Sequence, residues 1–212
     1  QCTSLTDVTM PNVSIIPRSA FANCTSLQNI TFSDTNQVID NNAFQGCAAL
    51  TNINLNEGIE EVGVLSLSFC DNLESINIPS TVTSLGSSLV RNNFALTDVT
   101  VNWNTPLAIS SNVFDTLDLS AMTLMVPDGT VSLYSNAAVW QDFGNIIVSA
   151  PQIINIPDPN FEQALIDLNI DSDGIINGQM FFSYASHRLS DEQHNFRARH
   201  LGESCKQTLF FF

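Results

Sequence analysis

A near-repeat decides the fold: residues 20–27 read Ala20-Phe21-Ala22-Asn23-Cys24-Thr25-Ser26-Leu27, and residues 43–50 read Ala43-Phe44-Gln45-Gly46-Cys47-Ala48-Ala49-Leu50. The cysteines of these two stretches belong to a series, Cys2, Cys24, Cys47 and Cys70, with spacings of 22, 23 and 23 residues. Such regular spacing indicates a structural repeat before it indicates disulfide pairing.

Apolar residues recur at fixed distances after each cysteine. A leucine follows after three residues, and apolar residues follow after six and eight. The members at six are Val8, Ile30, Ile53, Ile76 and Val99, and those at eight are Met10, Phe32, Leu55, Ile78 and Val101. Positions that differ by two point to the same face of a β-strand, and β-branched residues favour strands. A fifth unit keeps this register with Asn93 in place of cysteine, and a sixth, degraded unit ends near Pro127, where we expect the period to stop.

Two further apolar clusters complete each unit. One comprises Ile16, Ile39, Val62, Leu85 and Ile109, and the other comprises Phe21, Phe44, Leu67, Val90 and Phe114. A single short strand is not stable alone, but successive strands stacked about 4.8 Å apart form a parallel sheet around a shared core. The sequence therefore predicts a β-dominated solenoid of short parallel strands with a period of about 23 residues.

The pattern Ala-Phe-x-x-Cys-x-x-Leu-x-x-Ile-x-Ile resembles the BspA-type leucine-rich repeat, over about residues 1–127. The resemblance implies a leucine-rich-repeat solenoid of the α/β horseshoe class, in a secreted or cell-surface protein of bacteria or some protists that adheres to other proteins. Units three and four depart from the pattern with Ser66-Leu67 and Leu89-Val90 in place of Ala-Phe. These replacements keep the core position apolar.

The segment after the repeats predicts the end of the solenoid domain and the start of a second module. We expect a capping helix over about 130–143, with Thr130 as its N-cap and Gly144 as its stop, which closes a solenoid domain of residues 1–148. Residues 149–157 are expected to be a linker, and residues 158–180 the cap helix of a second repeat module. Residues 181–212 show no period, so we interpret them as an out-of-frame or truncated end, with a genuine irregular tail as the alternative. Because Gln1 and Cys2 enter in mid-repeat, the chain is interpreted as a fragment.

The charges differ between the body and this tail. Residues 1–180 hold 18 acidic residues and two arginines, whereas residues 181–212 hold three acidic and four basic residues, which gives −16 and +1 of the total net charge of −15. Such an acidic chain is a poor partner for nucleic acid or an anionic membrane. The body also contains no histidine or lysine, the commonest general base and the Schiff-base nucleophile, so we expect no enzyme. No signal peptide or membrane-spanning apolar run is visible, and no cofactor is expected.

Two groups of residues suggest cation or thiol chemistry. The cysteines are interpreted as inert buried thiols, with disulfides or metal ligands as the alternatives. Asn169, Asp171 and Asp173 resemble the first half of a calcium loop, but Asn169 stands where Asp is preferred and Met180 where a bidentate Glu is needed. We favour a simple Asp-rich turn there and expect no metal site.

The outward face of the predicted sheet is the main candidate for function. Its residues are short, polar and nearly uncharged: Asp7, Thr9, Asn29, Thr31, Asn52, Asn54, Ser75, Asn77, Asp98 and Thr100. We refer to these ten residues as the open-face stripe. The sequence predicts a monomeric adhesion module whose stripe holds an extracellular protein or glycan, without membrane insertion. The alternatives are a structural spacer of a larger surface protein and, third, a non-catalytic fragment of a multidomain secreted enzyme.

Overall fold

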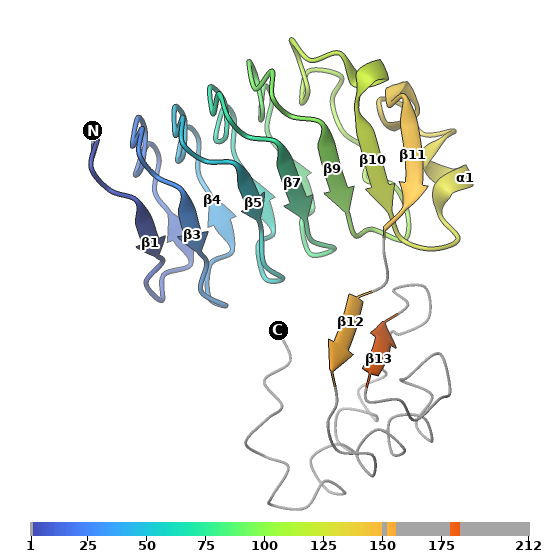
Figure 1. The fold of residues 1–212 in the computed structure, drawn as a ribbon, viewed down its shortest axis with the longest axis horizontal. Coiled ribbons are helices and arrows are strands. Elements are labelled where there is room, and N and C mark those ends of the chain that lie inside the picture. The colour runs from blue at the N-terminus through green and yellow to red at the C-terminus, as the bar shows by residue number, and fades with distance from the viewer. Residues whose placement is uncertain (1, 150–151, 156–178, 183–212) are drawn as a thin grey trace, which may run out of the picture. The chain divides into compact units, whose positions relative to one another are not determined.

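Short strands stacked in two parallel rows form the first part of the chain (Figure 1). The computed structural model describes residues 2–149, 152–155 and 179–182. The chain divides into two units, Gln1–Ser149 and Ala150–Phe212. The predicted leucine-rich-repeat solenoid is confirmed for the first unit. Across the part of the chain that the structure describes, we find no helix with the length and apolar character to span a membrane.

The front row contains the strands predicted after each cysteine. They are β1 (Asp7–Thr9), β3 (Asn29–Thr31), β5 (Asn52–Asn54), β7 (Ser75–Ile78), β9 (Asp98–Val101), β10 (Thr123–Val126) and β11 (Asn145–Val148). All paired neighbours run parallel and in register, for example Ile76 opposite both Ile53 and Val99. Strands β1 and β3 form one sheet and β5 to β11 another, so the ladder is interrupted between β3 and β5.

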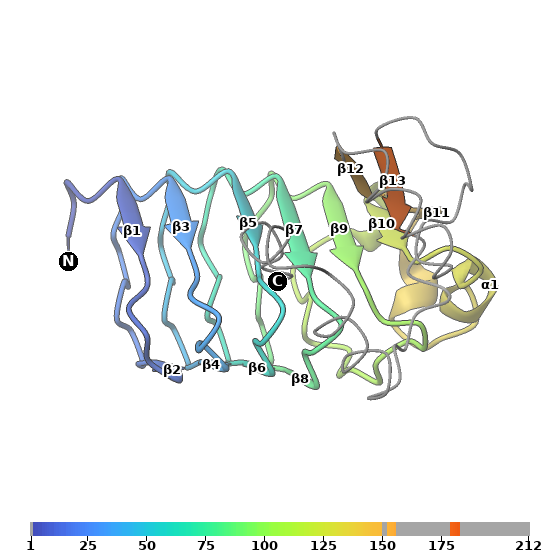
Figure 2. The ribbon, with the colours of Figure 1, turned by 90° about the horizontal axis from the view of Figure 1, so that it is seen from below.

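The back row contains two-residue strands at the second apolar cluster. They are β2 (Ile15–Ile16), β4 (Val38–Ile39), β6 (Glu61–Val62) and β8 (Ser84–Leu85), and they form one parallel sheet. Figure 2 shows the two rows facing each other across the inside of the coils. Ile16, Ile39 and Val62 point inward from the back, and Leu27, Leu50 and Leu73 are completely buried beside them. Full burial of one such side chain stabilises the fold by about 1.5–3 kcal/mol.

A third row of hydrogen bonds joins the turns 18–23, 41–46, 64–69 and 87–92, which we call the turn edge. The N–H of Phe21 donates to the carbonyl of Ala43 at 2.8 Å, and that of Phe44 to the carbonyl of Ser66 at 2.9 Å. Two residues in each turn have positive φ, between 55° and 73°: Ser19, Asn23, Asn42, Gly46, Leu65, Phe69, Ser88 and Asn92. The sequence analysis did not predict this ladder.

The C-terminal end of the solenoid differs from the expected helix over 130–143. Only α1 (Val131–Tyr134) is α-helical, and the 3₁₀ turn η2 (Trp140–Asp142) follows it. A helix over the whole segment is excluded at Val139, which has a φ of 71°. The indole N–H of the next residue, Trp140, donates to the carbonyl of Leu107 at 2.7 Å. Thr130 is not a side-chain N-cap, since its hydroxyl donates to the carbonyl of Pro127 at 2.6 Å.

Aromatic rings close this end of the core. The ring centroid of Trp140 lies 5.8–5.9 Å from those of Trp103, Phe114 and Tyr134. A second 3₁₀ turn, η1 (Leu119–Ala121), lies beside Gly144. A Cβ at Gly144 would stand 1.8 Å from the carbonyl oxygen of Ser120, so the close approach of two backbones requires glycine there.

The ladder of front strands continues past Pro127, where we expected the period to stop. Strand β11 adds a seventh member to the front row, with Ile146 opposite Leu124 and Val148 opposite Val126. The sequence analysis missed it because α1 and η2 replace the back strand and the turn of this coil. The signal was present as the apolar pair Ile146 and Val148, each 22 residues after its partner.

In the second unit, β12 (Gln152–Asn155) pairs antiparallel with β13 (Gln179–Phe182). Residues 152–155 thus form a strand where we expected a linker, and β13 crosses the boundary that we placed at residue 180. Local sequence does not reveal this pairing because the partner lies far along the chain. The predicted cap helix after residue 158 and the tail after residue 182 lie outside the described residues.

Candidate functional site

The open-face stripe lies on the front row, where the alternation of each strand places it. In register, Asp7 lies opposite Asn29 and Thr9 opposite Thr31. After the interruption of the ladder, the remaining six residues form two files, Asn52–Ser75–Asp98 and Asn54–Asn77–Thr100. The six residues up to Asn54 are exposed, and the four from Ser75 on are half-buried. The structure therefore brings the predicted residues together in two neighbouring groups.

Hydrogen bonds run along the stripe from coil to coil. The amide of Asn29 donates to Oδ1 of Asp7 at 2.7 Å, and that of Asn77 to Oδ1 of Asn54 at 2.5 Å. An asparagine has two N–H donors and an acceptor oxygen with two lone pairs, so a bonded amide in such a file keeps capacity for a ligand. Hydrogen bonds from Thr6 and Asn29 hold the pKa of the Asp7 carboxyl below its usual range.

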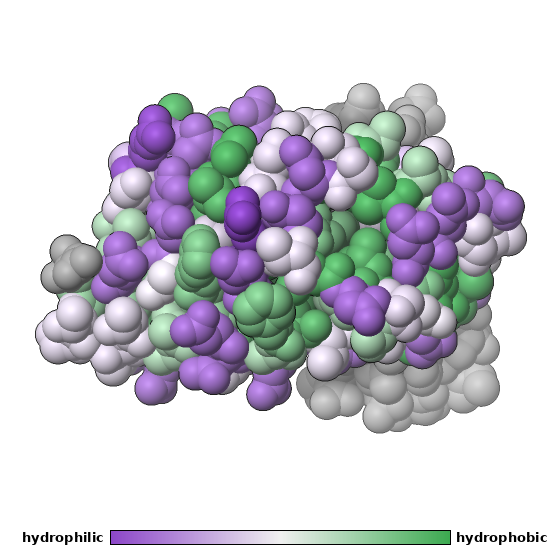
Figure 3. Space-filling view, turned by 90° about the horizontal axis from the view of Figure 1, so that it is seen from above, coloured by the Kyte–Doolittle hydropathy of each residue, from purple (hydrophilic) through white to green (hydrophobic). Residues whose placement is uncertain are grey.

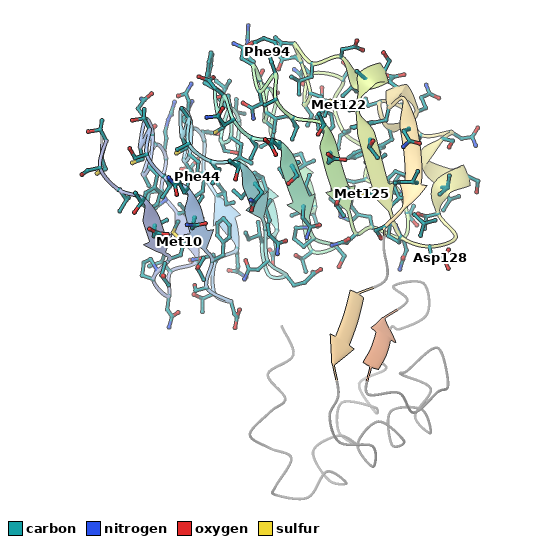
Figure 4. All side chains as sticks on the ribbon, in the orientation of Figure 1. Met10, Phe44, Phe94, Met122, Met125 and Asp128 are labelled. Carbon is teal, nitrogen blue, oxygen red and sulfur yellow. The ribbon has the colours of Figure 1, made fainter. Side chains whose placement is uncertain are left out.

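The front face continues beyond the predicted stripe, where one of its two files stays polar and the other becomes apolar. Thr123 lies opposite Asp98, Met125 opposite Thr100, and Ile147 opposite Met125. Ile147 is 41% exposed, and the thioether of Met125 lies 3.9 Å from the hydroxyl of Thr100 (Figure 4). These residues were not predicted as part of the face, because the period was expected to stop with the sixth unit.

The cysteines form a buried file of free thiols. Cys24, Cys47 and Cys70 are buried and Cys2 is exposed, and none of these four is in a disulfide. The thiol of Cys47 donates to the carbonyl of Phe21 at 3.3 Å, and that of Cys70 to the carbonyl of Phe44 at 3.4 Å. Burial raises the pKa of both thiols to about 12. At these two positions the prediction of inert thiols agrees with the structure.

Asn93 occupies the next place in this file and makes the equivalent bond. Its amide donates to the carbonyl of Leu67 at 2.8 Å, and its Oδ1 accepts the N–H of Cys70 at 2.9 Å. A buried side chain with both functions satisfied replaces a thiol without loss of hydrogen bonding. The departure from the repeat pattern at this position is therefore structural.

The structure offers no metal site among the residues that it describes, where no three His, Cys, Asp or Glu side chains lie close enough to share an ion. Asn169, Asp171 and Asp173 lie outside the described residues. An ion pair of the solenoid joins Nη1 of Arg91 to Oδ2 of Asp115 at 3.6 Å.

Sequence and structure comparisons place this architecture in a family. The BspA type leucine-rich repeat region matches residues 1–120 in six copies. A leucine-rich repeat protein from Bacteroides ovatus is 25% identical, with a TM-score of 0.52 over 59% of this chain and 31% of its own. The pneumococcal vaccine antigen PcpA is 20% identical, with a TM-score of 0.56 over 69% of this chain and 36% of its own. This chain thus spans about a third of each of these two structures, and no curated protein matches it. The chain belongs to the BspA-type leucine-rich repeat family.

Proposed function

We propose that the solenoid is a non-catalytic binding module of a secreted or cell-surface protein, and that the open-face stripe holds an extracellular protein or glycan. One observation carries the proposal. Ten short polar side chains stand on parallel strands, in register within each of two groups, and their amides keep unused donors and acceptors. Such a flat polar face presents a regular series of hydrogen-bonding groups to an extended ligand.

The family supports the general class of this function. Leucine-rich repeats are typical of protein-interaction and surface modules, and one structural neighbour is described as a vaccine antigen. The charge of the described solenoid adds a second argument: with two arginines against 13 acidic residues in residues 2–149, it does not suit nucleic acid.

A structural spacer is the second candidate, and a specific observation favours it. The amides of Asn29 and Asn77 bond to neighbouring side chains of the same face. A face that satisfies part of its own hydrogen-bonding capacity needs no ligand to be stable in water. An aromatic anchor of the kind that dominates binding energy is also missing from the ten residues of the stripe.

Bulky substitutions on the stripe distinguish the two candidates. The variant Asn52→Trp/Asn54→Trp changes two exposed side chains, and Glu61→Trp/Ser84→Trp changes two exposed side chains on the back row as a matched control. Capture by immobilised fibronectin, fibrinogen, collagen and mucin glycans is measured for each. If the solenoid is a binding module, a probe captures the wild type and the control variant but not the stripe variant. If no probe captures the wild type, or all three proteins are captured equally, the spacer is the better account.

A further inference from the structure

Two phenylalanines are exposed at or beside the turn edge: Phe69 ends the turn 64–69, and Phe94 lies two residues after the turn 87–92. Phe94 is 76% exposed and Phe69 is 40% exposed, and Figure 4 shows Phe94 at the edge where the turns lie. Hydrogen bonds join the two coils that carry them: the N–H of Phe69 donates to the carbonyl of Arg91 at 2.9 Å, and that of Cys70 to the side-chain Oδ1 of Asn93 at 2.9 Å. Cys70 and Asn93 thus stand at equivalent positions in neighbouring coils. Phe69 directly precedes Cys70, and Phe94 directly follows Asn93.

Phe69 occupies a place that does not suit phenylalanine. Its φ is 59°, in the left-handed region, and the equivalent residues of the other turns are Asn23, Gly46 and Asn92. Glycine and asparagine adopt this conformation at low cost, whereas a bulky side chain is strained there. Such an outlier, on a side chain that still exposes 40% of its surface, is a reason to look for function.

Charged residues lie close to the two phenylalanines along the chain. Asp71 is exposed and stands one residue after Cys70, as Phe94 stands one residue after Asn93. Glu74 is also exposed, and Arg91, with 46% of its side chain exposed, is paired with Asp115. Figure 3 looks onto this side of the solenoid and shows hydrophobic residues among hydrophilic ones. The 13 acidic residues against two arginines in residues 2–149 make a second copy of the chain an electrostatically poor partner.

We propose that Phe69, Asp71, Arg91 and Phe94, which we call the turn-edge patch, form a second binding site, for a protein segment that carries basic residues around an apolar contact. Aromatic residues and arginine are the usual anchors of protein interfaces, and a complementary charge around them directs association. The site is separate from the open-face stripe, so the failure of one proposal leaves the other standing.

A phage-displayed library of random dodecapeptides, selected on the 212-residue chain, supplies the probe. We expect enrichment of peptides with lysine or arginine around an apolar residue. Their affinity should fall at least about tenfold in Phe94→Ser and in Phe69→Asn, since such anchors dominate interface energies. Asp71→Asn should weaken binding mainly at low salt, because a charge at the margin of a site acts through screened attraction. The Phe69→Asn variant relieves backbone strain, so unfolding cannot explain its loss of binding.

Two controls separate this site from other surfaces. Leu133→Ser changes an apolar side chain of α1 that is 48% exposed, and Asn52→Trp/Asn54→Trp changes the stripe; both should bind the peptides as wild type does. The proposal is overturned if the peptides bind Phe94→Ser as well as wild type, or if acidic or uncharged peptides are enriched instead. It is also overturned if the Phe94→Ser substitution abolishes self-association of the chain, which would make a second copy the occupant.

Discussion

The turns 41–46 and 64–69 occupy equivalent places in successive coils and are built from different residues. Each donates three backbone N–H groups to the next coil, and each has two residues with positive φ. The first turn uses Asn42 and Gly46 at the left-handed places, whereas the second uses Leu65 and Phe69. The residue after the first left-handed position also differs. In the first turn it is Ala43, which has a buried methyl group, and in the second it is Ser66, which has a buried hydroxyl without a hydrogen-bond partner.

This difference shows that stacking between coils, and not local preference, determines the backbone of the turn edge. Leucine and phenylalanine disfavour positive φ. They adopt it here because the N–H groups of Leu65 and Phe69 pair with the carbonyls of Ser87 and Arg91, and a buried backbone group left unpaired costs more than a strained φ. The turn 64–69 therefore keeps the left-handed backbone at a cost in the free energy of unfolding.

The cysteines that follow the two turns have the same environment, and their reactivity gives the largest expected effect. Burial raises the pKa of Cys47 and Cys70 from 9.0 to about 12. At neutral pH their thiolate fraction should be about a thousandfold below that of an ordinary thiol. We expect mass spectrometry after iodoacetamide treatment to find Cys2 modified and both buried thiols intact.

The same pKa values predict how stability changes with pH. Because the folded state retains thiol protons that the unfolded chain releases above pH 9.0, the free energy of unfolding should fall as the pH rises from 9.0 toward 12.

In the iodoacetamide experiment, equal modification of Cys2, Cys47 and Cys70 in the folded protein would contradict the buried file.

Truncation of the core residue in each turn gives the next largest effect. Phe44 stacks on Phe21 with centroids 5.3 Å apart and meets Phe32 edge to face at 6.1 Å. We expect Phe44→Ala to lower the free energy of unfolding by about 4 kcal/mol and Leu67→Ala by about 3 kcal/mol, measured by urea denaturation. Leu133→Ala, at an exposed position, should change it by less than about 0.5 kcal/mol. If Phe44→Ala costs no more than this control, the stacked core is wrong.

The buried hydroxyl gives a smaller effect of opposite sign. Ser66→Ala removes a polar group without a partner and should stabilise the protein by about 1 kcal/mol, whereas Ala43→Ser introduces one and should destabilise it by about the same amount. Thermal unfolding of both variants tests the pair. Destabilisation by Ser66→Ala would mean that the hydroxyl has a partner after all.

The sequence predicted the features that depend on apolar spacing and missed those that depend on stacking. Apolar residues six and eight positions after each cysteine predicted the front row, and Ile16, Ile39 and Val62 marked the back row. Asparagine or glycine at positions 23, 46 and 92 signals the left-handed residue that ends each turn of the turn edge. The ladder was nevertheless missed, because Phe69 stands at the same position in one turn and hides the pattern. The cap helix was placed too long because apolar spacing does not reveal the positive φ of Val139, which excludes a continuous helix over 130–143.

For the candidate site, alternation in the strands was sufficient to identify the ten residues of the open-face stripe. It did not reveal that the ladder is interrupted between β3 and β5 or that Met125 and Ile147 extend the face. The turn-edge patch was invisible to the sequence analysis, because exposure in a turn has no periodic signature.

The most direct test of the account is the free energy of unfolding of Phe69→Asn beside that of Asn23→Phe, both measured by urea denaturation. If stacking imposes a left-handed conformation at this place in every coil, Phe69→Asn stabilises the protein by about 0.5–1 kcal/mol, and Asn23→Phe destabilises it by about 1 kcal/mol. A loss of stability in Phe69→Asn together with an unchanged stability in Asn23→Phe would contradict the claim.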